Sequence, residues 1–118
     1  MYSLTDATDL LIKSEKLGNP KNIESIRKYN SHKVRHTIGV LEVGRHIIIK
    51  YKENNEISDD LTNKSEICFI LHDLGRLYQN NTDKILSNEE FDHGDKSAEI
   101  SAENGYSKSI VLAIKYHN

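Results

Sequence analysis

The sequence has a single cysteine, a single proline and no long apolar run. One cysteine, Cys68, excludes an internal disulfide and is typical of a reducing cytoplasm. Its apolar stretches, such as HIIIKY, are too short for a membrane-spanning helix, and the N-terminal segment MYSLTDATDL lacks the pattern of a signal peptide. Basic and acidic residues nearly balance, at 16 against 18, which gives no indication of a surface for nucleic acid or anionic membranes. We therefore expect a cytoplasmic protein that binds neither nucleic acid nor membranes.

What the sequence does contain is helical periodicity. Its 118 residues are 36% hydrophobic and 29% charged, which predicts one folded domain over residues 1–118. Strict alternation is absent, whereas apolar residues recur at helical spacing, so we predict an all-α fold, a compact bundle of about six or seven helices. The expected helices run from Ser3 or Thr5 to Lys16, Pro20 to Tyr29, Lys33 to Glu53, Asp60 to Leu74, Asp95 to Gly105 and Ser107 to the end, with one turn inside residues 78–91.

Histidines fall on the apolar faces of three expected helices. His36 shares a face with Val40, Val43 and Ile47, at helical spacings of i, i+4, i+7 and i+11. The other two lie on later helices: His72 stacks over Cys68, and His117 shares a face with Ile110 and Ile114. For any one of them, the commonest explanation is a core histidine that is hydrogen-bonded to a neighbour.

Asp73 is harder to explain as part of a core. A buried carboxylate is costly unless it is paired or bound to a metal. Adjacent helical residues point about 100° apart, so His72 and Asp73 would not face each other but could converge on one external atom. A divalent cation is the natural candidate, because imidazole and carboxylate together suit Mn, Fe, Zn, Ni or Co.

Four segments of the sequence then point to a family. The segments RHTIGVLEVG, ICFILHDLGR, DHGDKSAEI and VLAIKYHN follow one another over residues 35–118. In this order, and each in a helical context, they resemble the HD-domain superfamily of metal-dependent phosphohydrolases. The resemblance implies an HD-domain-like helical fold with His36, His72 and Asp73 as metal ligands and Asp73 as the central catalytic residue. It implies that His93 and His117 bind a second metal bridged by Asp73, or face the substrate phosphate if there is only one metal.

The resemblance also implies a ligand that this sequence does not contain. HD domains usually supply one more aspartate from a helix after the last histidine, whereas here only Asn118 follows His117. Either the chain is a fragment of a longer protein that lacks its last helices here, or the site is incomplete, or another residue stands in, with Asp92 and Asp95 as weak candidates.

Three functions are compatible with these observations. The first is a phosphohydrolase that cleaves a small phosphoester, such as a nucleotide, with a metal-activated water. The second is a non-catalytic module that binds a metal or a nucleotide, and the third is a structural helical protein. For the first function we expect Arg76, Arg35 and Lys96 to bind substrate phosphate. Each has a simpler explanation, as a cation near a helix end or a solvated side chain.

Overall fold

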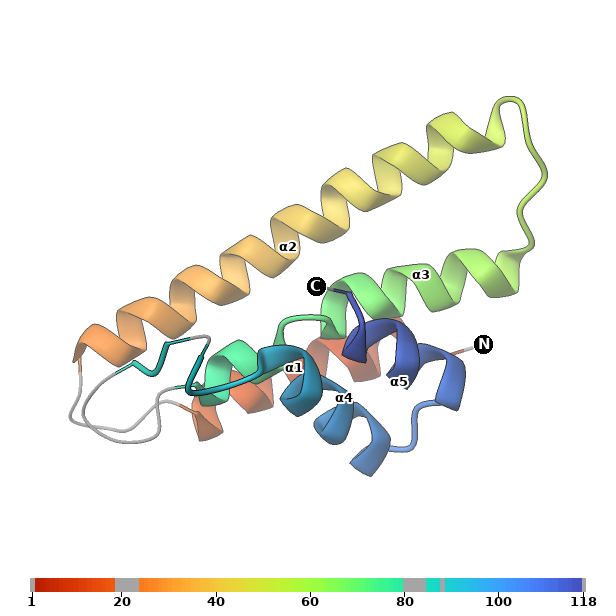
Figure 1. Ribbon diagram of the computed structural model, residues 1–118. Helices are drawn as coiled ribbons and strands as arrows, with labels where there is room; N and C mark the ends of the chain where they lie inside the picture. Colours follow the sequence, from red (N-terminus) through yellow and green to blue (C-terminus); the bar gives the residue numbers. More distant parts are fainter. Residues whose placement is uncertain (1, 19–23, 80–84, 88, 118) are drawn as a thin grey trace.

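The computed structural model describes residues 2–18, 24–79, 85–87 and 89–117. Within these ranges the chain is all-α, as predicted, with five α-helices, one short 3-10 helix and no β-strand (Figure 1). The elements are α1 (Leu4–Leu17), α2 (Glu24–Lys52), α3 (Asp59–Leu71), η1 (Leu74–Tyr78), α4 (His93–Glu103) and α5 (Lys108–Lys115). No helix in the described part of the chain is long and apolar enough to cross a membrane.

Helix α1 begins and ends where the sequence predicts. The Ser3 hydroxyl accepts a hydrogen bond from the backbone N–H of Asp6 at 3.1 Å, so Ser3 rather than Thr5 is the N-cap. The backbone N–H of Gly18 donates to the carbonyl of Ser14 at 2.9 Å and closes the last turn. Local capping chemistry is therefore sufficient to set both ends of this helix.

The structure has one helix, α2, where the sequence predicted two, Pro20 to Tyr29 and Lys33 to Glu53. Residues 24–52 form one continuous helix, with no break between Tyr29 and Lys33. Asn30, a residue that often ends helices, is fully buried, and its side-chain amide donates to the carbonyls of Gly18 and Leu77, each at 3.1 Å. The side chain thus binds groups outside its helix, and the helix continues. The predicted start of the first helix of the pair, at Pro20, lies outside the described residues.

The buried face of α2 also differs from the predicted one. The expected apolar stripe is largely open to solvent, since Val43 and Ile47 are each 61% exposed. The fully enclosed positions of the helix are instead Ile26, Asn30 and Thr37. The predicted stripe lines an open groove of about 520 Å³ beside Phe69 of α3. Hydrophobic spacing alone could not distinguish this face from the buried one, because the buried positions of α2 include Asn30, Thr37 and Gly44, which are polar or small.

The other helices enclose the core. Its fully enclosed members come from α1, α3, η1 and α5, and they include Ala7, Ile67, Leu71, Leu74, Leu77, Ile110 and Ile114. Figure 1 shows α2 lying along one side of the molecule, with α3 beside it and α1, α4 and α5 gathered on the far side of α3. The side chain of Arg45 on α2 donates to Glu66 on α3 at 2.8 Å, which joins the second half of α2 to α3.

Three helix ends near the predicted site are corrected by the structure. Helix α3 ends at Leu71 rather than Leu74, which leaves His72 and Asp73 in a turn before η1. Helix α4 begins at His93, because the carboxylate of Asp92, not Asp95, accepts the backbone N–H that caps it. Helix α5 ends at Lys115, so His117 follows the helix and does not belong to it.

Candidate metal centre

Asp73 lies in the turn that joins α3 to η1. Its backbone has φ −111° and ψ 16°, outside the helical range, and only 8% of the residue is exposed. This break in the helix turns the carboxylate toward His72, whose Nε2 lies 3.3 Å from Asp73 Oδ2. The two adjacent side chains therefore do face each other, contrary to the prediction from helical geometry. The turn, and not the helix, is what brings them together.

Gly75 allows α4 to approach this turn closely. Its backbone N–H donates to the hydroxyl of Ser97 at 2.7 Å, in the buried contact between η1 and α4. A Cβ atom at this position would press on the carbonyl oxygen of His93 and would come within 3.0 Å of the Lys96 side chain. The absence of a side chain at Gly75 is therefore what lets the first residue of α4, His93, reach Asp73.

Substitution of Gly75 should disturb both the fold and the site. We expect Gly75→Ala to lower the free energy of unfolding by about 1–3 kcal/mol, as overpacking of a tight contact does, and to weaken metal binding by displacing His93. The matched control is Gly39→Ala on α2, where an added Cβ would meet nothing within 4 Å and should be neutral or stabilising. Urea unfolding of the two metal-free variants measures the difference. Equal stability of the two would contradict the close contact at Gly75.

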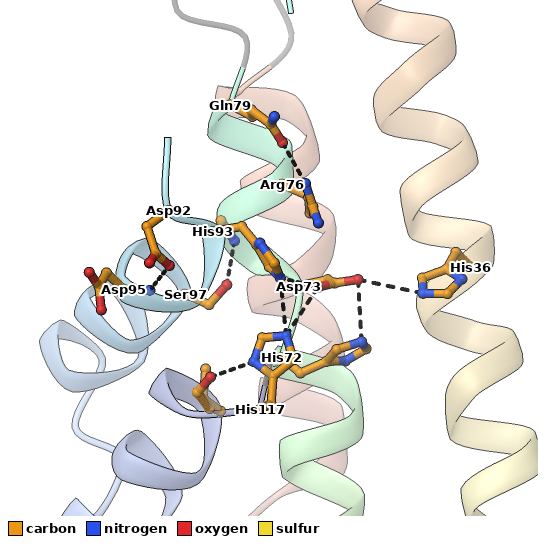
Figure 2. A network of polar contacts seen from close by, with 12 residues as sticks. His36, His72, Asp73, Arg76, Gln79, Asp92, His93, Asp95, Ser97 and His117 are labelled. Atoms are coloured by element: carbon orange, nitrogen blue, oxygen red, sulfur yellow. Dashed lines mark hydrogen bonds and ion pairs between the residues drawn. The ribbon is translucent and has the colours of Figure 1, made fainter. Parts of the chain in front are cut away.

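Four histidines surround the Asp73 carboxylate in two pairs (Figure 2). Nε2 of His36 lies 3.5 Å and Nε2 of His72 3.3 Å from Oδ2. On the other oxygen, Nε2 of His93 lies 3.4 Å and Nε2 of His117 3.5 Å from Oδ1. Figure 2 shows His36 reaching the carboxylate from α2, while His93 and His117 come from the side of α4 and α5. Each carboxylate oxygen thus belongs to a separate group of three ligand atoms.

Backbone carbonyls determine which ring nitrogens carry protons. Nδ1 of His72 lies 2.7 Å from the carbonyl oxygen of Phe69, and Nδ1 of His117 makes a similar contact with the carbonyl of Ile114. A carbonyl can only accept, so both Nδ1 atoms are donors, and in the neutral rings both Nε2 atoms present lone pairs. Those lone pairs point at a carboxylate, which also presents only lone pairs. Such an arrangement is stable only with a proton or a cation between the groups.

The spacing of these atoms fits a metal better than hydrogen bonds. Charge-assisted N–H···O bonds are typically about 2.7–2.9 Å long, shorter than the 3.3–3.5 Å observed around Asp73. Two ligand atoms bound about 2.1 Å from one ion, at roughly tetrahedral angles, lie about 3.4 Å apart. The Nε2 atoms of His93 and His117, 3.2 Å apart, fit the same geometry. The donor set of imidazole nitrogens and one carboxylate is therefore suited to a divalent transition metal.

The ionisable groups affect one another strongly. Burial alone would raise the pKa of Asp73, but a hydrogen bond from His72 and the charges of His72, His93 and His117 hold it well below its usual range. Burial disfavours the charged form of His72, yet the hydrogen bond to Asp73 and its charge outweigh this and raise the pKa of His72. Burial and the charge of Arg76 lower the pKa of His93. Asp73 therefore stays ionised, and His93 neutral, over the range in which metals bind.

Metal affinity should fall on mild acidification. A bound metal requires neutral imidazole. An ordinary histidine has a pKa near 6.5, and because the pKa of His72 is raised, this ring takes up a proton at a higher pH than that. Affinity should therefore be constant well above the pKa of His72 and decrease as the pH drops through it, while Asp73 is still ionised. Titration of metal-free protein with Co²⁺ from pH 8 to 5 checks this. Affinity that stays constant down to pH 5 would contradict the role of His72.

The predicted site residues divide into two groups. All five predicted metal ligands, His36, His72, Asp73, His93 and His117, lie together. Among the predicted phosphate contacts, Arg76 lies next to Asp73 on η1 (Figure 2). The other two predicted contacts have other surroundings. Arg35 is exposed on the side of α2 that carries Arg27 and Lys28, and the ammonium of Lys96 lies over the ring of Tyr78 and beside Glu99.

The other histidines, the weak ligand candidates and the single cysteine have their own surroundings. His32 and His46 are exposed on α2, outside both groups of ligand atoms. Asp92 caps α4, and Asp95 is exposed in the first turn of that helix. Burial raises the pKa of the Cys68 thiol, which disfavours a nucleophilic thiolate at this position.

Sequence reasoning missed a buried glutamine beside the site. The side-chain oxygen of Gln79, which is 3% exposed, accepts from Arg76 Nη1 at 3.1 Å and from the Tyr29 hydroxyl at 3.2 Å. Its side-chain amide donates to the carbonyl of Leu86. The only sequence signal was the position of Gln79 three residues after Arg76, which is too common a spacing to be informative. These bonds hold the Arg76 side chain beside the cluster of Asp73, His36, His72, His93 and His117, called the Asp73 cluster below.

Comparison with known families agrees with this geometry. The HD domain family matches residues 34–118, a range that contains every residue of the Asp73 cluster. The chain therefore belongs to the HD-domain family, the superfamily of metal-dependent phosphohydrolases. Neither the curated proteins nor the solved structures gave a match.

Proposed function

We propose that this protein is a metal-dependent phosphohydrolase that cleaves a small phosphoester such as a nucleotide. The observation that carries the proposal is the division of Asp73 between two pairs of histidines, one pair at each carboxylate oxygen. Membership of the HD-domain family supports the reaction class. The His36 side chain is 47% exposed, so that a substrate could reach the centre from the side of α2.

Two groups of residues would hold the metals. His36, His72 and Asp73 form one, and Asp73, His93 and His117 form the other, with Asp73 common to both. Three protein ligands at each position leave room for water and substrate, as catalytic sites require. A divalent transition metal bound there, such as Mn, Fe, Co, Ni or Zn, would supply Lewis-acid activation of water and of a phosphoryl oxygen.

The rest of the site acts through the residues themselves. The carbonyls of Phe69 and Ile114 keep the protons of His72 and His117 on Nδ1, so that each Nε2 faces Asp73 ready to bind. The planar guanidinium of Arg76 suits the oxygens of a phosphate. Gln79 fixes one edge of that guanidinium. The chain thus provides both the ligands and a positioned cation for an anionic substrate.

A turnover assay tests the proposal. Metal-loaded protein should hydrolyse p-nitrophenyl phosphate or bis(p-nitrophenyl) phosphate, and a chelator should abolish the reaction. Asp73→Asn should lose this activity, whereas His46→Ala, an exposed histidine on the same helix as His36, should keep it. Metal binding without turnover of either compound or of common nucleotides would instead support the alternative, a non-catalytic metal or nucleotide-binding module.

A further inference from the structure

A second group of polar residues lies beside the metal centre, between α2 and η1. Gln79 joins the two elements, because its side-chain oxygen accepts from Tyr29 on α2 and from Arg76 on η1. Gln79 is buried, whereas Tyr29 and Arg76 are half-buried and so remain in reach of solvent. Figure 2 shows Arg76 between Gln79 and Asp73. A line of polar groups therefore leads from Asp73 through Arg76 to Tyr29.

Lys33 lies along the same line. Tyr29, Lys33 and His36 are spaced i, i+4 and i+7, which places them on one face of α2. His36 contacts Asp73 at one end of this face, and Tyr29 contacts Gln79 at the other. The ammonium of Lys33 lies 5.4 Å from the centre of the Tyr29 ring, so its charge lies beside the residue that joins α2 to Gln79. Two cationic side chains are thus linked to Tyr29, Lys33 through the ring and Arg76 through Gln79.

The charges around this face favour anions. Residues 24–36 contain four lysine or arginine residues and one acid, although the whole chain has net charge −2. Burial raises the pKa of Tyr29, so its hydroxyl stays neutral at physiological pH and keeps its hydrogen bond to Gln79. Lys33 adds a second cation to Arg76, which is more positive charge than a single phosphate monoester at the metals requires.

We propose that Lys33 and Arg76, both linked to Tyr29, form an anion subsite for a second negatively charged group of the substrate. The substrate class is then a phosphoester with at least two anionic groups, to which nucleoside diphosphates belong. One phosphoryl group lies at the metal centre and the other lies against Lys33 and Arg76. Gln79 is the positioning residue that holds Arg76 and Tyr29 in place. This inference rests on the proposed function, since it concerns the substrate of the same site.

Binding of two analogues tests the inference. The probes are hydrolysis-resistant analogues of AMP and ADP in which carbon replaces each bridging oxygen, titrated calorimetrically into Mn²⁺-loaded protein at fixed excess Mn²⁺. The native sequence should bind the ADP analogue more tightly. Lys33→Gln should weaken the ADP analogue about tenfold or more, the effect of one lost charged contact, and the AMP analogue less than about threefold. Tyr29→Phe, which keeps the ring beside Lys33 but removes the hydrogen bond to Gln79, should weaken the ADP analogue about fivefold because Gln79 and Arg76 are held less firmly.

The control is Lys28→Gln. It removes the same charge from the same helix, but Lys28 lies about 140° around α2 from Lys33, on the exposed side with Glu24 and Arg35. It should change neither affinity by more than about twofold. Equal effects of Lys28→Gln and Lys33→Gln, or no preference of the native sequence for the ADP analogue, would overturn the subsite alone. Failure of the native sequence to bind Mn²⁺ or the AMP analogue would overturn the proposed function, and the subsite with it.

Discussion

Asp73→Ala should abolish metal binding at both positions. Asp73 is the only residue common to the two groups of ligand atoms, with one carboxylate oxygen in each. Its removal leaves four imidazoles without an anion, so we expect metal affinity to fall by more than about 100-fold, beyond the 10–100-fold that loss of a supporting residue costs. Metal content after dialysis at equal free metal measures the loss, and phosphoester turnover should disappear with it.

Two further variants separate loss of the ligand from loss of the fold. Asp73→Asn keeps the shape of the side chain and removes only its charge, and it should lose metal as completely as Asp73→Ala. Asp95→Ala removes an exposed carboxylate from the first turn of α4 and should bind metal normally. All three should retain the helical circular dichroism of the native sequence. Full metal content or full activity in Asp73→Ala would contradict the site assignment.

The second large effect is a change in stoichiometry. If the two groups of ligand atoms hold separate ions, His36→Ala should empty one position and His93→Ala the other, and each variant should retain one metal. Either change should also lower turnover about 100-fold or more, since both ions act on one phosphoester. Elemental analysis of the two variants at equal free metal gives the comparison, with His46→Ala as the exposed-histidine control.

The two variants distinguish a site with one metal ion from a site with two. Retention of two metals by His93→Ala would remove His93 from the ligand set. Loss of all metal in His36→Ala, together with full retention in His93→Ala, would leave a single ion at His36, His72 and Asp73. His93 and His117 would then face the substrate rather than a metal.

The sequence predicted where helices begin and end better than which face of a helix is buried. Capping at Ser3 and the end near Gly18 are local properties, and local chemistry determined them. The buried face of α2 depends on Asn30, whose partners Gly18 and Leu77 lie 12 and 47 residues away. No periodicity in α2 reports those bonds, and its exposed apolar residues suggested a different face.

For the site, the sequence supplied the residue types but not their arrangement. The His72–Asp73 pair and the separated histidines were recognisable because a buried carboxylate requires a partner. Helical geometry predicted that His72 and Asp73 diverge, whereas the turn after Leu71 makes them converge. Gln79 and the carbonyl of Phe69 carry no signal in the sequence, because a glutamine or a backbone carbonyl acquires its role only from what packs against it.

The most direct test of the metal centre is the number of metal ions per chain. Protein purified without chelator, and metal-free protein reconstituted with Mn²⁺ or Fe²⁺, should each be analysed for transition metals. The two groups of ligand atoms around Asp73 predict about two equivalents, lost in Asp73→Ala. Protein that remains free of metal in both preparations would contradict the assignment of His36, His72, Asp73, His93 and His117 as a metal centre.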